Sequence, residues 1–151
     1  MIKALTRASL IGCALLQTCS VVSPPPQKPT LDVTGNWQGT SVTACGVMLL
    51  EQGRCNAVQH ISFSLFQDGS KLTGVYRCSP GTMICQNMNE GGQVVASTLE
   101  GSLGRIRVEL PDGSTCMFNG NFKNESVVGG FGCYQGGGLL EQGSWQATRL
   151  F

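Results

Sequence analysis

The sequence predicts an all-β fold: an eight-stranded antiparallel up-and-down barrel that follows a signal peptide and a proline-rich tether. Residues 35–40 and 143–148 both read Gly-x-Trp-Gln-x-Thr, an alternation typical of half-buried strands. Because these segments stand at opposite ends of a β-patterned chain, we expect them to pair and close the sheet. Short polar turns, such as those at 67–70 and 111–114, separate the segments between them.

Residues 1–18 have the pattern of a signal peptide. Lys3 and Arg7 precede a short apolar run that is too short to span a membrane as a mature helix. The residues that end at Cys19 resemble the cleavage motif of a bacterial lipoprotein, which implies that Cys19 becomes the lipidated N-terminus. Two alternatives stay open: a second motif of this kind that ends at Cys13, and an ordinary secretory signal. In each case we expect the protein to be exported.

Residues 19–34 are assigned to the lipidated cysteine and its tether, and residues 35–151 to the barrel domain. The tether has three consecutive prolines and no apolar period, which predicts an extended, semi-rigid spacer. The lipid would hold the protein on the outer or inner membrane of a bacterium, facing the periplasm or the cell surface. Charged residues make up 13% of the chain without a basic run, so no nucleic-acid partner is expected.

The strands of the barrel are expected from alternating apolar and polar residues. Their approximate bounds are 35–45, 56–67, 71–78, 92–103, 105–110, 115–122, 127–134 and 143–150. Residues 103–105 are predicted to be a tight turn between the fourth and fifth strands. The connections between strands 1 and 2, 3 and 4, 5 and 6, and 7 and 8 fall at one end, the mouth. Three of these four are predicted to be long, including residues 135–142, whereas short hairpins close the other end.

The cysteines indicate disulfides. Apart from Cys13 and Cys19, six cysteines remain in the exported part, an even number in an oxidising compartment. The strand order predicts three bridges at the mouth: Cys45–Cys55, Cys78–Cys85 and Cys116–Cys133. The third follows from pairing the sixth strand with the seventh, which also places Phe118 opposite Phe131. No metal site is expected, because the sequence has no Cys-x-x-Cys and only one histidine, His60.

Gly35, Trp37 and Arg149 resemble the structural signature of the calycins, the lipocalin and avidin-type barrels. In that group a Gly-x-Trp tryptophan lies at the closed end, and a basic residue of the last strand lies across its ring. The resemblance implies a calycin-like barrel over residues 35–151. It also implies a cation–π contact between Trp37 and Arg149, worth about 0.5–2 kcal/mol. No further lipocalin motif, biotin-binding pattern or lysozyme-inhibitor signature is evident.

The mouth connections are unusually apolar for loops. The sequence Leu-Leu-Glu-Gln-Gly occurs at 49–53 and again at 139–143. We therefore expect these connections to form a rim that binds an apolar ligand or partner. The residues of this rim are Met48, Leu49, Leu50, Met83, Ile84, Leu139 and Leu140. The alternative is that these side chains fold over the barrel and plug it. Glu51 and Glu141 are expected to keep the rim soluble, and a carboxylate pair is the alternative.

The barrel interior is the second place where a ligand could bind, because eight strands enclose either side chains alone or one small molecule. The inward candidates are Trp37, Phe63, Tyr76, Phe118, Phe131 and Trp145, with Gly39, Gly74, Gly120 and Gly129 leaving room beside them. This aromatic content favours a mostly filled barrel.

The sequence thus predicts a membrane-anchored lipoprotein that binds a small apolar ligand or partner at the mouth. The alternative is a structural or interaction module of the cell envelope, for example an enzyme inhibitor, with a filled barrel. No catalytic residue or cofactor is expected, because the chain has no nucleophile motif or phosphate-binding loop. His60 is expected to be a solvated strand residue, and Asp68, Asp112 and Glu125 to belong to turns.

Overall fold

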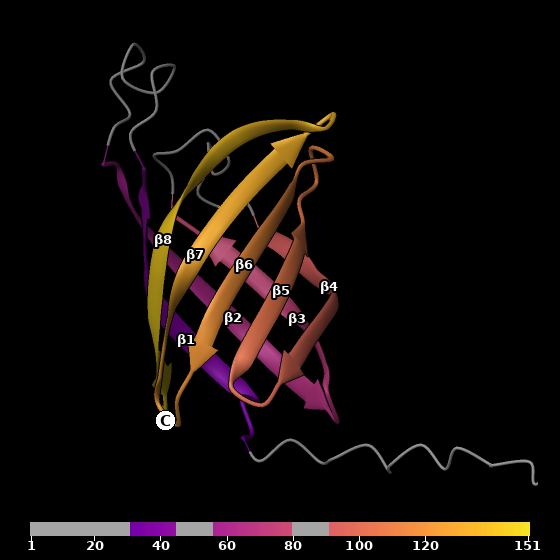
Figure 1. The fold of residues 1–151 in the computed structure, drawn as a ribbon, viewed down its shortest axis with the longest axis vertical. Coiled ribbons are helices and arrows are strands. Elements are labelled where there is room, and N and C mark those ends of the chain that lie inside the picture. The colour runs from indigo at the N-terminus through magenta and orange to yellow at the C-terminus, as the bar shows by residue number, and fades with distance from the viewer. Residues whose placement is uncertain (1–30, 45–55, 80–90) are drawn as a thin grey trace, which may run out of the picture.

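The computed structural model describes residues 31–44, 56–79 and 91–151, which form a single sheet of eight antiparallel strands. The strands are β1 Gly35–Thr43, β2 Val58–Asp68, β3 Lys71–Cys78, β4 Gly91–Glu100, β5 Leu103–Glu109, β6 Thr115–Phe122, β7 Ser126–Gln135 and β8 Gly138–Leu150. Each strand pairs with the next, and β1 pairs with β8, so the sheet is a closed up-and-down barrel (Figure 1). The predicted fold class is confirmed. Within the described residues, no helix is long and apolar enough to cross a membrane.

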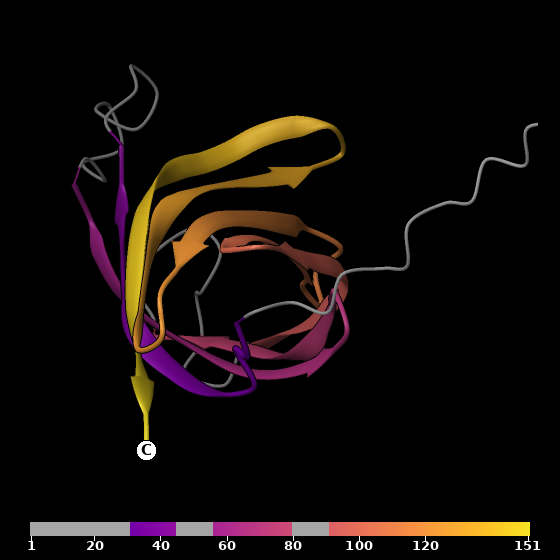
Figure 2. The same cartoon turned by 60° about the horizontal axis from the view of Figure 1, so that its bottom comes forward.

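The seam of the barrel is the pairing of β1 with β8, as the two tryptophan segments predict. Trp37 lies opposite Arg149, and Ser41 lies opposite Trp145. Figure 2, in which the lower end of Figure 1 comes forward, shows the strands surrounding one interior. Since all eight strands have a neighbour on both sides, closure removes the exposed sheet edges that an open sheet would carry.

The core follows the alternation expected from the sequence. On β2, Ile61, Phe63 and Leu65 are buried, whereas His60 and Ser64 are exposed. The same period of two puts one face of every strand in the interior, where apolar side chains leave water. The six aromatic residues predicted to point inward are all buried.

The two ends of the barrel differ. At the closed end, short turns join β2 to β3, β4 to β5 and β6 to β7. Residues 31–34, which the sequence prediction assigned to the tether, lie against this end. Val33 is fully buried there, and its amide donates a hydrogen bond of 2.8 Å to Oε1 of Gln67. The chain therefore enters the barrel at the closed end, opposite the mouth.

The turn predicted at residues 103–105 is wrong. Leu103 already belongs to β5 and pairs with Glu100, so the β4–β5 turn consists of Gly101 and Ser102. Gly101 has a φ of 62°, which costs a glycine little.

The predicted long connection at residues 135–142 is also wrong. A two-residue turn of Gly136 and Gly137 joins β7 to β8, with φ values of 57° and 83°. Two positive φ angles are what a tight type I′ hairpin requires, and paired glycines meet that requirement. β8 therefore begins at Gly138, and the mouth has two long connections, not three. These connections, 44–57 and 79–90, lie largely outside the described residues.

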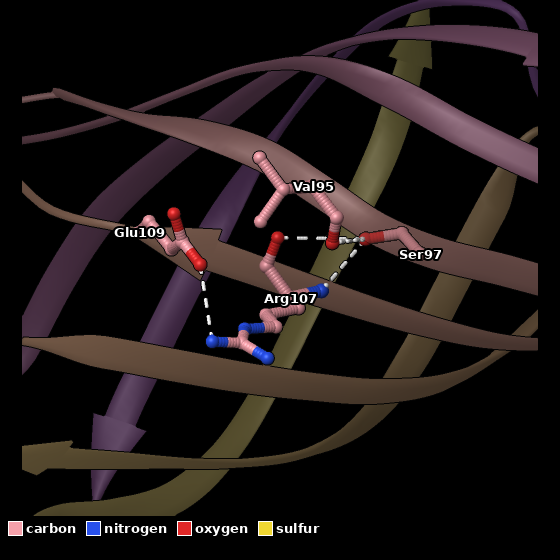
Figure 3. A network of polar contacts seen from close by, with 4 residues as sticks. All are labelled: Val95, Ser97, Arg107 and Glu109. Atoms are coloured by element: carbon pink, nitrogen blue, oxygen red, sulfur yellow. Dashed lines mark hydrogen bonds and ion pairs between the residues drawn. The ribbon is translucent and has the colours of Figure 1, made fainter.

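A bulge in β4 keeps its inward pattern in phase. The register with β5 shifts between Val95 and Thr98, and Ala96 has a φ of 46°. The hydroxyl of Ser97 donates to the carbonyl of Val95 at 3.0 Å and accepts from the amide of Arg107 at 2.8 Å (Figure 3). The extra residue lets both Val94 and Leu99, an odd number of positions apart, point into the core.

Candidate functional site

The middle of the barrel is occupied by a cluster of aromatic rings, as the sequence predicts. Phe118 lies at its centre, with ring centroids 5.2–5.5 Å from those of Phe63, Tyr76, Phe131 and Trp145. Toward the closed end, Phe122 continues the cluster to Trp37 and Trp145. Edge-to-face and tilted pairs at these distances are favourable contacts. A ligand at the level of Phe118 would therefore have to displace aromatic side chains.

The predicted role of the interior glycines holds only in part. Gly120 does make room for an aromatic side chain, since a Cβ there would lie 2.8 Å from Cζ2 of Trp145. At Gly39 and Gly129, by contrast, a Cβ would overlap a backbone carbonyl of the neighbouring strand. These two glycines permit close approach of strands rather than space for a ligand.

A polar cluster lies in the interior at the mouth end. Glu141 points inward from β8 and is only 3% exposed. The hydroxyl of Thr43, inward on β1, donates a hydrogen bond to Oε1 of Glu141. Burial raises the pKa of Tyr76 above its ordinary range, and the negative charge of Glu141 adds to this effect. Glu141 is the only charged side chain among the buried residues of the described part.

The burial of Glu141 corrects the sequence prediction, which placed this residue on an exposed rim to keep it soluble. The error follows from assigning residues 135–142 to a loop. Had β8 been extended backward, its period of two would have found the site, because Glu141 shares the inward parity of Trp145 and Ala147. Thr43 could have been found in the same way from Trp37 on β1. Glu51, its predicted partner in a carboxylate pair, lies outside the described residues.

The walls around Glu141 come from β6 and β7. Cys133 lies opposite Glu141, and Cys116 lies opposite Cys133. The two cysteines form the predicted disulfide, with their Cα atoms 4.0 Å apart, and both are buried. The bridge therefore lines the interior beside the carboxylate, where it fixes the spacing of β6 and β7.

A groove of about 460 Å³ opens beside this cluster at the mouth end of the seam. It is lined by Val42, Thr43, Ala44, Asn56, Phe131, Gln142, Gly143 and Ser144. A Cβ at Gly143 would overlap the backbone carbonyl of Val42 and would lie 3.0 Å from the ring of buried Phe131, so Gly143 permits the close approach of β1 and β8 there. Thr43 thus borders the groove and also bonds the carboxylate inside the barrel.

The predicted rim is only partly within the described residues. Leu139 is 50% exposed and Leu140 is partly exposed, and both lie on β8 beside the Gly136–Gly137 turn rather than in a loop. The other five predicted rim residues lie outside the described residues, and their placement stays a prediction. These are Met48, Leu49, Leu50, Met83 and Ile84.

The remaining cysteines are less fully described. Cys78 is disulfide-bonded, and its predicted partner, Cys85, lies outside the described residues. Cys45 and Cys55 also lie outside them, as does the predicted lipidation site Cys19. The pairings Cys45–Cys55 and Cys78–Cys85 therefore stay predictions.

The signature residues meet at the closed end. The guanidinium carbon of Arg149 lies 5.9 Å from the centroid of the Trp37 ring, which is the contact that the calycin resemblance implies. Arg149 also donates hydrogen bonds to the carbonyls of Asp32, at 3.1 Å, and of Thr34. The indole Nε1 of Trp37 donates to the carbonyl of Val33 at 2.9 Å. Together these bonds fasten the segment before β1 across the closed end.

The polar candidates outside the barrel do not converge on a chemical site. His60 is exposed on the outer face of β2, where its backbone amide donates a hydrogen bond of 3.1 Å to the hydroxyl of Ser79. Within residues 31–44, 56–79 and 91–151, no three His, Cys, Asp or Glu side chains are grouped to hold a metal.

Comparisons with known proteins give no relative: no family model, curated protein or solved structure matches the chain significantly. The eight-stranded closed barrel is consistent with a calycin-like fold. A site at the mouth is therefore supported by the contacts and burial described above, and not by a relative.

Proposed function

We propose that this protein is an exported, lipid-anchored member of the calycin-like barrels that binds an apolar small ligand or partner at its mouth. The observation that carries the proposal is the contrast between the two parts of the interior. The middle is packed with aromatic rings around Phe118. The mouth end has a groove, exposed Leu139 and a buried carboxylate. Binding is therefore proposed at the mouth and not deep in the barrel.

The place where the chain enters the barrel indicates from which end the proposed anchor would attach. Eleven residues, 20–30, separate Cys19 from Leu31, and the fully extended chain between the two would span at most about 40 Å. The chain reaches the barrel at the closed end, where Val33 is buried. A lipid on Cys19 would therefore attach to the domain from its closed end and would hold that end within about 40 Å of the membrane. The mouth, at the opposite end of the barrel, would then be free of the attachment point.

A second candidate is an interaction module of the envelope, such as an enzyme inhibitor, that uses the same end of the barrel against a protein. The filled aromatic middle favours it, because a carrier that encloses its ligand needs space there. In this form the exposed side chains of Tyr134 and Leu139 beside the β7–β8 turn would contact the partner. We propose no enzymatic activity and no cofactor for either form.

Two experiments test the proposal. Cys19→Ser should move the protein from the membrane fraction to the soluble fraction of the envelope, whereas Cys13→Ser should not; equal fractionation of both variants with the wild type would refute the anchor. Replacing Leu49, Leu50, Leu139 and Leu140 together by serine should abolish capture of the ligand or partner while the circular dichroism spectrum is kept. Capture that persists in the folded variant would refute binding at the mouth.

A further inference from the structure

A second groove lies on the outer wall of the barrel, outside the interior and apart from the groove at the end of the seam. It has a volume of about 150 Å³ and lies over β2 and β3, beside β1. His60 meets none of the acidic residues of the turns, but it lies in this groove together with Arg77. The polar side chains of the lining are Gln38, His60, Ser62, Arg77 and Ser79.

The pairing of β2 with β3 brings four of these side chains into one block. Ser62 lies opposite Arg77 in the register of the two strands. His60 lies opposite Ser79, because the amide of Ser79 donates a hydrogen bond of 2.9 Å to the carbonyl of His60. All four share the outward face of the sheet, since the residues between them on both strands are buried. Side chains that face one another across two strands are about 5 Å apart at their Cβ atoms, so one small ligand can contact several of them.

The block offers hydrogen-bond donors and positive charge without a carboxylate. No Asp or Glu of the described residues lines the groove. The guanidinium of Arg77 is exposed and makes no ion pair or hydrogen bond with any residue that the structure describes. The hydroxyl of Ser79 accepts a hydrogen bond from the amide of His60, so its own proton remains available to a ligand. The outward neighbours of the block are uncharged as well, and they include Thr40, Ser64, Val75 and Gln93.

A phosphate group matches this set of donors better than a carboxylate does. A phosphate monoester presents three acceptor oxygens, whereas a carboxylate presents two. The planar fork of the Arg77 guanidinium can bind two of the three oxygens. The hydroxyl of Ser62, which lies opposite Arg77, can then donate to the third.

We infer that the groove on the outer wall binds a phosphate group, held by Arg77 and Ser62, with His60 and Ser79 at its edge. The ligand is either soluble phosphate or the phosphate of a lipid headgroup, since the donors recognise the same chemical group in both. This site goes beyond the proposed binding at the mouth, and it uses none of the residues of that end of the interior.

Titration with inorganic phosphate, followed by NMR, tests the inference on the chain with Cys19→Ser. A titration with sodium chloride to the same ionic strength separates binding from screening. We expect saturating shifts at the amides of Ser62 and Ser79, with a dissociation constant of about 1 mM. Arg77→Gln should weaken binding about ten-fold, because it removes the charge-assisted bonds, and Ser62→Ala should weaken it about three-fold. Both side chains lie on the outer wall, so both variants should keep the fold.

The matched control is Arg105→Gln, which removes an exposed arginine from the outer face of β5 and should leave phosphate binding unchanged. Acetate, as a carboxylate of similar size, should bind about five-fold more weakly than phosphate. Shifts that do not saturate beyond the chloride titration, or binding that is unchanged in Arg77→Gln, would overturn the inference. Equal binding of acetate and phosphate would overturn the choice of phosphate. Each of these results would leave the proposed binding at the mouth intact.

Vesicles distinguish the two sources of the phosphate. Phosphatidylcholine vesicles that contain phosphatidic acid are compared with vesicles of phosphatidylcholine alone, again with the Cys19→Ser chain. Capture that requires both phosphatidic acid and Arg77 would identify a lipid headgroup as the ligand. Binding of inorganic phosphate without such capture would identify soluble phosphate. Capture that Arg77→Gln leaves unchanged would overturn a lipid phosphate in this groove.

Discussion

Replacing Phe118 by alanine should destabilise the protein severely. Phe118 is 1% exposed, and its ring contacts those of Phe63, Tyr76, Phe131 and Trp145. Phenylalanine-to-alanine changes in packed cores cost about 3–5 kcal/mol, and the upper half of that range applies where, as here, the neighbouring rings cannot all collapse into the space. With a urea m-value of roughly 2 kcal/mol/M, the unfolding midpoint should fall by about 2 M.

The assay is urea unfolding followed by tryptophan fluorescence with the disulfides intact, since the Trp145 ring centroid lies 5.5 Å from that of Phe118. Phe66→Ala is the matched control: Phe66 is 60% exposed on β2, and its loss should change the free energy of unfolding by less than about 0.5 kcal/mol. A cost below about 1 kcal/mol for Phe118→Ala would refute the packed middle. A ligand inside the barrel would then again be a candidate.

Three further predictions concern the closed end, the disulfide and one turn. Arg149→Met should lower the free energy of unfolding, measured by thermal unfolding, by about 1–3 kcal/mol, because it removes the cation–π contact with Trp37 and the hydrogen bonds to two carbonyls. The same change at exposed Arg105 should leave the free energy of unfolding unchanged, and equal effects of the two changes would refute the contact. The double change of Cys116 and Cys133 to serine should cost about 3 kcal/mol, given their separation of 17 residues, and an unchanged midpoint would contradict this. The hydroxyl and the amide of Ser114 hold the pKa of Asp112 below its usual range, so its stabilisation is present above about pH 4 and is lost as the pH falls through the lowered pKa. The stability advantage of wild type over Asp112→Asn should therefore shrink in acid, and an advantage that grows in acid would reverse the sign.

The seam and one disulfide could be predicted from the sequence because each depends on a local pattern with one outcome. The repeated Gly-x-Trp-Gln segments gave two strands of the same parity, and antiparallel pairing at the ends of the chain closes the barrel. A hairpin turn after Phe122 fixes the register of β6 with β7, which places Cys116 opposite Cys133 and Phe118 opposite Phe131. Once the turn fixes the register of the two strands, it also fixes which side chains point into the barrel and which point out.

The start of β8 could not be predicted from the same signals. Residues 135–142 combine three glycines, two leucines and a glutamate, a composition that suits a loop as well as a strand. The two positive φ angles at Gly136 and Gly137 turn the segment into a tight hairpin, and only then does Glu141 acquire an inward direction. The bulge at Ala96 could not be predicted for a related reason, because no local sequence pattern marks an alanine with a positive φ. The neighbouring Ser97 stabilises the bulge through its hydrogen bond with the amide of Arg107 on the next strand.

Native mass spectrometry of the protein released from its own cell envelope, with the wild type beside the variant that has serine in place of Leu49, Leu50, Leu139 and Leu140, tests the anchor and the binding at the mouth together. We expect a chain that begins at a lipid-modified Cys19 and carries a bound ligand or partner, whose added mass is absent from the variant. A chain with an unmodified N-terminus and no bound mass, or bound mass that the folded variant retains, would contradict it.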